Sequence, residues 1–438
     1  MFASTITRRF GLAAAIKSLP AKTAKFSSFT KPALSDSLLP GIGNLRNCTD
    51  EEGMMREAAR KFATTVIAPK VMEMDENEAI DKTVLKGLFE QGFMGIETPA
   101  DYNGTEASFT SAIAYSYQHQ RSLDIFFVFL CLELAKIDGS ISVACDVQNT
   151  LVNTVFKKYA NADLKKKFLP QLAESKVGCF CLSESGSGSD AFALKTTAEK
   201  KSDHWVINGS KMWITNSGEA EIFLVFASVD MSKGYKGITC FVVEKSMGVS
   251  ILKKEKKLGI RASSTCSLDF DNIKVPLENV VGEIGKGYKI AIEILNEGRI
   301  GIGAQMLGIA QGAFDYTLPY LFQRKQFGSE IGNFQGMQFQ YAQIAMEIEA
   351  ARLLVYNAAR LKEEGKPFVK EAAMAKLYSS QVAERTTSRC VEWLGGVGFT
   401  REYPVEKFYR DCKIGSIYEG TTNIQLQTIA KQVSADYK

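Results

Sequence analysis

The spacing of apolar and polar residues divides the chain into three regions. From residue 48 to 170, apolar side chains recur at helical spacing, as in Met55, Ala59 and Phe62. Pro69 is expected to end or kink this first helix, because proline lacks the amide that the helix requires. The pattern predicts an N-terminal all-α domain over residues 48–170.

Residues 175–278 have the pattern of strands. Trp205–Ile207, then Asn208-Gly209, then Lys211–Ile214 is typical of a hairpin with a two-residue turn. No helical period intervenes before residue 278, so a middle antiparallel β domain is predicted rather than alternating strands and helices. Continuous apolar runs of strand length follow the hairpin at Ile222–Phe226 and Ile238–Val243.

The helical period returns over residues 285–438. An apolar stripe passes through Ile344, Ile348, Ala351 and Val355, and a second one follows it along the chain. Several long helices in succession predict a C-terminal helical bundle. The expected fold class is therefore α+β multidomain: helical, β, then helical.

One segment breaks the N-terminal pattern. Tyr115–Leu130 interrupts what should be a single helix from Phe109 towards Lys136, and its apolar run Ile125–Leu130 shows no helical alternation. Residues 115–130 are thus an atypical insertion. They are interpreted either as a genuine loop that packs on a partner or as non-coding sequence retained in the gene model.

Charge is distributed unevenly along the chain. Formal net charge is +4, yet residues 1–35 carry six basic residues and no acidic one, which leaves 47 basic against 49 acidic residues in the remainder. A basic, serine-rich and acid-free N-terminus is typical of a mitochondrial transit peptide; a secretory signal or a plain tail fits less well. The balanced remainder does not indicate nucleic-acid binding.

Cysteine and histidine content limits the chemistry. Nine scattered cysteines without a Cys-x-x-Cys pair indicate free buried thiols, and only His119 and His204 are available as histidines. No metal site is therefore expected, a Ser-His-Asp triad is disfavoured, and a catalytic base would be a carboxylate. No run of about 18 uncharged apolar residues occurs, so no membrane span is expected.

A serine- and glycine-rich segment, Phe180–Asp190, follows a predicted strand. Its small residues allow close backbone approach to an anion or a flavin ring. Gly186, Gly188 and Ala191 also match a dinucleotide-binding fingerprint, but the following residues predict a strand where that fold needs a helix. A surface turn is the remaining interpretation.

Five further motifs each have a structural and a chemical interpretation. Trp213 at a strand end is usually core, although it can also wall a planar cofactor. Glu419 lies in a loop, where a carboxylate is normally solvated, before Thr421 and Thr422, two helix-capping hydroxyls. The remaining three could be structural: an ion pair in Asn296–Arg299, a loop in Arg324–Gly328 with Gln335, and a helix cap in Glu392–Phe399. Alternatively, each could contact a ligand.

Taken in order, these motifs resemble the acyl-CoA dehydrogenase family. The resemblance rests on Cys181–Asp190, Lys211–Ile214, Arg324–Gly328, Trp393–Gly398 and Ile417–Gln425, and covers nearly everything after residue 48. Within the family, Gln148–Thr150, Leu258–Thr265 and Asn296–Gly308 are similar to members specific for short and branched acyl chains.

The resemblance implies an FAD-dependent enzyme that forms 2-enoyl-CoA from short and 2-methyl-branched acyl-CoA. It implies that the C-terminal helices form a four-helix bundle and that the chain assembles as a homotetramer. It also implies electron transfer to electron-transfer flavoprotein, the mitochondrial matrix, and a place in isoleucine and short-chain fatty acid catabolism. Straight short-chain specificity is the nearest alternative. An acyl-CoA oxidase using oxygen and a non-enzymatic scaffold are the rivals; the C-terminal Ala-Asp-Tyr-Lys is not the peroxisomal Ser-Lys-Leu.

The resemblance also assigns roles to individual residues. Glu419 matches the family's base, and Gly298 occupies the position that carries the base in other members. Implied FAD contacts are Phe180, Cys181, Leu182, Ser183, Glu184, Ser185, Gly186, Ser187, Gly188, Ser189, Trp213, Ile214 and Thr215, with Thr421, Thr422 and Asn423 closing over the cofactor. Implied contacts to the FAD of a neighbouring subunit are Arg324, Gln335, Glu392, Trp393, Leu394, Gly395 and Gly396. Implied acyl-CoA contacts are Ser189, Tyr235, Tyr288, Asn296, Glu297, Gly298, Arg299 and Gly420.

Overall fold

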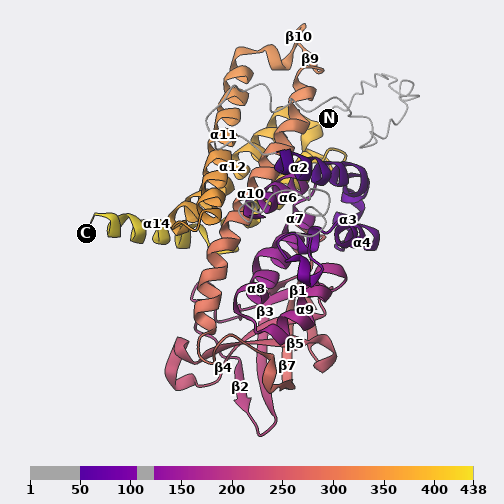
Figure 1. The fold of residues 1–438 in the computed structure, drawn as a ribbon. Helices are drawn as coiled ribbons and strands as arrows, with labels where there is room; N and C mark the ends of the chain where they lie inside the picture. Colours follow the sequence, from indigo (N-terminus) through magenta and orange to yellow (C-terminus); the bar gives the residue numbers. More distant parts are fainter. Residues whose placement is uncertain (1–49, 106–122, 438) are drawn as a thin grey trace, which may run out of the picture.

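Most helices gather at one end of the molecule and the strands at the other in the computed structural model, which describes residues 50–105 and 123–437 (Figure 1). The predicted transit peptide, residues 1–35, lies outside the described residues. The α+β class predicted from the sequence is confirmed. The helices before the sheet are α2 (Asp50–Phe62), α3 (Val71–Asn77), α4 (Lys82–Glu90), α6 (Leu123–Ala135), α7 (Gly139–Asp146), α8 (Thr154–Tyr159) and α9 (Ala162–Glu174).

The first helix ends before Pro69, as expected. The chain passes from α2 through one π-helical turn and one 3-10 turn over residues 63–70 before α3 begins. A second π-helical turn, η7 (Val147–Asn153), joins α7 to α8. It matters for the site because it places Leu151 against the first helix of the C-terminal bundle.

The interruption expected over residues 115–130 is wrong for its second half. Residues 123–130 form the first turns of α6, which is continuous to Ala135, and Phe126–Leu130 are all buried. A helix surrounded by protein is apolar on every side, and it therefore shows none of the alternation from which a surface helix is recognised. Residues 115–122 lie outside the described residues.

Eight strands form one twisted sheet. Their order is β6-β7-β3-β2-β4-β5-β8, with β1 beside β4, and the pairs β1–β4 and β2–β4 are parallel while the others are antiparallel. The strands are β1 (Gly178–Cys181), β2 (Thr197–Lys200), β3 (His204–Thr215), β4 (Ile222–Ser228), β5 (Ile238–Glu244), β6 (Ser250–Lys254), β7 (Thr265–Pro276) and β8 (Val280–Val281). The predicted buried strands at Ile222–Phe226 and Ile238–Val243 are confirmed as β4 and β5.

The hairpin predicted at Asn208-Gly209 is wrong. Both predicted strands belong to the single strand β3, and the turn lies earlier, between Lys200 and Trp205. Asn208-Gly209 instead forms an irregularity in the pairing of β3 with β7. Glycine is needed there because φ is +144° and a Cβ would lie 2.7 Å from Thr196 Cα on the neighbouring strand.

Gly209→Ala is therefore expected to lower the free energy of unfolding by about 2–3 kcal/mol, because the added methyl group meets backbone. Chemical denaturation measures this effect. Gly53→Ala in α2 is the matched control: its Cβ has no atom within 4 Å, and alanine favours the helix. Equal denaturation midpoints for the two variants would contradict the prediction.

The C-terminal helices form a bundle around the long helix α10. The helices are α10 (Gly287–Leu321), α11 (Gln335–Glu363), α12 (Val369–Leu394), α13 (Val405–Cys412) and α14 (Thr422–Asp436), with a small hairpin of β9 (Lys325–Gln326) and β10 (Ser329–Glu330) between α10 and α11. The stripe predicted through Ile344, Ile348, Ala351 and Val355 is buried, which confirms it. Figure 1 shows the β9–β10 hairpin at the end of the bundle remote from the sheet, and α14 projecting from its side.

The cysteines and the apolar content of the helices agree with the predictions made from the sequence. The eight cysteines in the described part of the chain are free and buried, while Cys48 lies outside it. Within residues 50–105 and 123–437, no helix has the length and apolar character needed to cross a membrane.

Candidate active site

Glu419 lies in a tight turn between α13 and α14. Its φ is +51° and that of Gly420 is +85°, so two successive residues adopt left-handed backbone conformations. Thr421 caps α14 by accepting the Ile424 amide at 3.5 Å. Thr422 is the first helical residue and does not cap, so only one of the two predicted capping hydroxyls has that role. This turn aims the Glu419 side chain inward instead of into solvent.

The Glu419 carboxylate lies against α10 where that helix carries Gly298. A Cβ at Gly298 would lie 3.2 Å from Glu419 Oε2 and 3.3 Å from Leu151 Cδ2. Oε2 is buried and accepts no hydrogen bond within the part of the chain that the structure describes. A buried carboxylate oxygen without a partner is costly, and such groups are typical of functional sites. The absence of a side chain at Gly298 therefore allows the carboxylate to lie close against α10.

Burial raises the pKa of Glu419 to about 7, and the positive charges of Lys376 and Arg299 oppose that rise. Burial likewise lowers the pKa of Lys376 to about 8. A nearby carboxyl, Asp146 at the end of α7, has its pKa raised well above the usual range by burial and by the charge of Glu419. Glu419 therefore ionises near neutral pH.

The Asn296–Arg299 segment of α10 divides its side chains between two roles. Arg299 Nη1 donates to Asn296 Oδ1 at 2.8 Å, and Arg299 is the cation that α10 contributes near Glu419. Glu297 is buried and forms ion pairs with Lys158 and Lys362, the latter at 3.1 Å. Of the predicted acyl-CoA contacts here, Gly298 and Arg299 lie beside Glu419, whereas the Glu297 carboxylate is held by lysines.

The serine- and glycine-rich segment forms a loop after β1, and the helix that a dinucleotide-binding fold requires does not follow it. Ser183 O accepts the Met212 amide at 2.9 Å, which ties this loop to β3. Glu184 accepts Lys211 Nζ at 2.8 Å, and both side chains are buried. Gly186 and Gly188 face open space, since a Cβ added at either residue would have no atom within 4 Å. The Glu184 carboxylate braces the loop, and the glycines leave its outer face accessible.

Trp213 is more than half exposed, at 55%, so its interpretation as a core residue is wrong. Its φ is +63° and it lies at a break in the β3–β7 register between Lys211 and Ile214. The bulge turns the indole outward beside the Ser183 loop, because Met212 is bound to that loop. A flat aromatic surface and an open glycine loop are thus side by side.

Two predicted substrate contacts meet near the start of α10. The rings of Tyr235 and Tyr288 pack edge to face with centroids 4.9 Å apart, and Tyr235 is 48% exposed. They come from segments 53 residues apart in sequence. The structure therefore brings this pair together as an exposed aromatic surface.

The residues predicted to reach a neighbouring subunit lie far from Glu419. From Arg299, α10 continues for 22 residues to Leu321, about 33 Å of helix, before Arg324 is reached. Arg324 and Gln335 are exposed there. Trp393 Nε1 donates to Gln340 Oε1 at 3.0 Å, which places the end of α12 beside the start of α11. These residues form one group, separate from Glu419 within a single chain.

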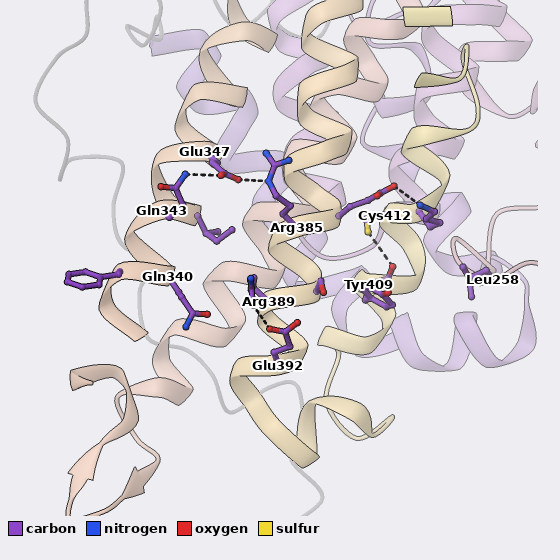
Figure 2. A pocket seen from close by; sticks show the side chains of 14 residues that line it. Leu258, Gln340, Gln343, Glu347, Arg385, Arg389, Glu392, Tyr409 and Cys412 are labelled. Carbon is purple, nitrogen blue, oxygen red and sulfur yellow. Dashed lines mark hydrogen bonds and ion pairs between the residues drawn. The ribbon is translucent and has the colours of Figure 1, made fainter. Parts of the chain in front are cut away.

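A groove of about 730 Å³ adjoins this group between α11, α12 and α13 (Figure 2). Ion pairs cross it or line it: Glu347 with Arg385 at 2.8 Å, and Arg389 with Glu392 at 2.7 Å. None of the residues packed around the Glu419 carboxylate lines this groove. It is therefore a separate feature of the bundle surface.

Sequence reasoning missed three buried polar residues around Glu419: Lys376, Gln425 and Asp146. Lys376 stands within the apolar stripe of α12, between Ala375 and Ser379, and a lysine in such a stripe is the one signal that was available. Its partner is a backbone carbonyl 44 residues away, which no local pattern reveals.

Known protein families match most of the chain. The acyl-CoA dehydrogenase N-terminal domain matches residues 49–176, the middle domain residues 179–273 and the C-terminal domain residues 285–434.

Individual proteins are similar over nearly their whole length. The short/branched chain specific acyl-CoA dehydrogenase, mitochondrial, of Rattus norvegicus is 57% identical over 90% of this chain and 88% of its own. Butyryl-CoA dehydrogenase from Megasphaera elsdenii superposes with a TM-score of 0.84 at 39% identity, over 89% of this chain and 99% of that one. A glutaryl-CoA dehydrogenase from Mycobacterium smegmatis in complex with FADH2 superposes with a TM-score of 0.80 at 26% identity, over 89% of this chain and 95% of that one.

Proposed function

The chain belongs to the acyl-CoA dehydrogenase family, and on that premise we propose that Glu419 is the base that dehydrogenates short and 2-methyl-branched acyl-CoA with FAD as cofactor. The observation that carries the proposal is the buried, unpartnered Glu419 Oε2 facing Gly298. The substrate class rests on relatives named as short/branched chain specific, which are 54–57% identical.

The residues present fit a flavin. Trp213 offers an exposed aromatic face, and Gly186 and Gly188 leave room for close backbone approach beside it. We expect residues 180–189 and 213–215 to hold the flavin, and Thr421–Asn423 to close over it. When bound, FAD supplies the hydride acceptor that the protein's side chains lack.

The chain's own part of the reaction is proton abstraction. The ionised Glu419 carboxylate, which Gly298 allows to lie close against α10, takes the proton from the α-carbon of the thioester. No hydrogen bond to the Glu419 amide is found among the described residues, so this N–H remains available to the thioester oxygen as negative charge develops there. Exclusion of water by the surrounding apolar residues strengthens both interactions.

The assembly proposed is a homotetramer. Arg324, Gln335 and Glu392–Gly396 are separated from Glu419 by about 33 Å of helix, so these residues reach a cofactor only in another copy of the chain. Sedimentation of the purified protein tests this, and a monomer that retains FAD and activity would contradict it. We also propose electron-transfer flavoprotein as the electron acceptor.

We propose a mitochondrial location, which the similarity to relatives named as mitochondrial supports. We propose the matrix as the compartment, because residues 1–35 are basic, rich in serine and free of acidic residues. Fractionation of mitochondria isolated from cells that express the full chain tests whether the protein is found in the matrix.

The function is tested by adding acyl-CoA to the purified yellow protein without oxygen. Bleaching of the flavin absorption is expected with 2-methylbutanoyl-CoA and, more slowly, with isobutanoyl- and butanoyl-CoA. One methyl group typically changes discrimination by about 1–3 kcal/mol, so the ratio of rates decides the chain preference. Absence of bleaching with all three overturns the proposal, and rapid turnover with oxygen alone identifies an oxidase.

Activity is expected to fall on the acid side of neutral pH. A base with a pKa of about 7 is protonated below that value, so kcat/KM should decrease tenfold per pH unit below about pH 6. The same shift affects stability: because burial raises this pKa above the unfolded value, ionising Glu419 costs stability as pH rises through 7. A profile of kcat/KM from pH 5 to 9 measures the first effect, and a flat acid limb would contradict it.

A further inference from the structure

Lys376 is completely buried on α12 and points at the backbone of the turn that carries Glu419. Its Nζ donates to Gly420 O at 2.7 Å. A lysine is rarely buried without a carboxylate hydrogen-bonded to its ammonium, and here the hydrogen-bond partner is a main-chain carbonyl. Burial at that cost indicates a role for the charge at this position.

A second buried side chain binds the same turn. Gln425, in the first turn of α14, donates Nε2 to Glu419 O and to Gly420 O, both at 2.9 Å. Lys376 and Gln425 together hold two successive carbonyls of residues that both have positive φ. For glutamate this conformation is unfavourable, and it persists only where the surroundings fix it. The two side chains form a clamp on the turn.

The clamp sets the electrostatic surroundings of the carboxylate as well. Charged and titratable groups facing Glu419 are Lys376 from α12, Arg299 from α10, Asp146 from α7 and the adjacent Tyr418. Burial, with the neighbouring carboxyls, raises the pKa of Tyr418 well above its usual value, and burial and the charge of Glu419 raise the pKa of Asp146. Lys376 and Arg299 therefore supply the positive charge that opposes burial.

We propose that Lys376 is a positioning residue for the base: it fixes the Glu419–Gly420 turn through the Gly420 carbonyl and keeps the Glu419 carboxylate ionised through its charge. Gln425 provides the first of these roles without the second. The inference rests on the proposed function for the identity of Glu419 as the base.

The two roles are separated by paired variants of the FAD-loaded full chain. Lys376→Met removes both the charge and a hydrogen bond, Gln425→Met removes hydrogen bonds only, and Lys376→Arg keeps the charge. The carboxyl of Glu419 is titrated by infrared difference spectroscopy, with Glu419→Gln as the subtraction reference. The pH profiles of kcat and KM are measured alongside.

Lys376→Met should raise the titration midpoint of Glu419, and with it the acid limb of kcat/KM, by about one pH unit. Lys376→Arg should restore the wild-type midpoint. Gln425→Met should lower the plateau kcat between about tenfold and 100-fold, through misplacement of the base, while its midpoint and KM stay near wild type.

An unchanged Glu419 midpoint in Lys376→Met overturns the proposal, as does an equal shift in Gln425→Met. If the methionine variant does not fold, Lys376→Gln removes the charge with a polar side chain and gives the same titration. Activity that survives in Glu419→Gln would instead refute the base assignment, since the infrared titration reports the coupling of Lys376 to Glu419 whether or not Glu419 is the base.

Discussion

Glu419→Gln is expected to lower kcat by about 10²–10⁴-fold, the contribution typical of a general base. Glutamine keeps the size of the side chain and its contact with Gly298, but it has no basic oxygen for the α-proton. The protein should remain folded and yellow, because Glu419 accepts no hydrogen bond that the fold requires at Oε2. Stopped-flow reduction of the flavin by 2-methylbutanoyl-CoA measures the chemical step directly.

Glu402→Gln is the matched control. Glu402 is an exposed carboxylate in the same C-terminal region, and its loss should leave the reduction rate unchanged. Retention of more than about a tenth of the wild-type rate by Glu419→Gln would contradict its role, since a lost base costs at least about 100-fold.

Lys407→Met is expected to cause the largest loss of stability, about 3–5 kcal/mol, because it strands buried charge. Lys407 is 3% exposed and lies between two fully buried carboxylates, with Nζ 2.5 Å from Asp411 Oδ2 and 3.5 Å from Asp138 Oδ2. Burial disfavours its ammonium, but the two carboxylates together raise the pKa of Lys407 above its usual value. The contribution of Lys407 is therefore fully present below its ordinary pKa and is lost as pH rises through the raised value. Burial also raises the pKa of Asp411, so protonation of that carboxylate at acid pH removes one of the ion pairs.

The same cluster joins three parts of the chain. Asp411 Oδ1 accepts the Ile260 amide at 2.6 Å from the sheet region, and Asp138 Oδ1 accepts the Ser140 amide at 2.6 Å at the start of α7. Loss of Lys407 thus leaves both carboxylates fixed by backbone and unable to move apart. We expect loosening between α13, α7 and the segment before β7.

Thermal and chemical denaturation of the loaded enzyme measure this effect. Lys86→Met is the control, because the Lys86–Glu90 pair is exposed and such pairs contribute about 0–1 kcal/mol. The double variant Lys407→Met with Asp411→Asn should recover part of the loss, since it removes one unpaired charge. A single variant as stable as Lys86→Met would refute the argument.

The order of helices and strands was predictable because it depends on residues that are close together in the sequence. Apolar residues at helical spacing on α11 and α12, and apolar runs in β4 and β5, depend on neighbours within a few residues, and each was placed correctly. Glu419 before the last helix was singled out by its match to a motif of the family that the chain resembles, and not by its local pattern alone. These features survive because tertiary contacts reinforce the local preference.

The two predictions that were wrong each rest on a local sequence pattern that is compatible with two different structures. Asn208-Gly209 suits a tight turn, but it equally suits a break in a long strand where a neighbouring backbone comes close. The apolar run at Ile125–Leu130 has no period because α6 is covered on all sides. Neither choice is decidable without the partner surface.

The sequence by itself determined the family, the three regions and the single carboxylate expected to act as base. Tertiary structure decided what surrounds that carboxylate: Gly298 across from it, Lys376 and Gln425 on its backbone, and the buried Asp146 nearby. These partners come from helices far apart in sequence. Their effect on Glu419 depends on distances in space and on burial, which the spacing of residues along the sequence does not give.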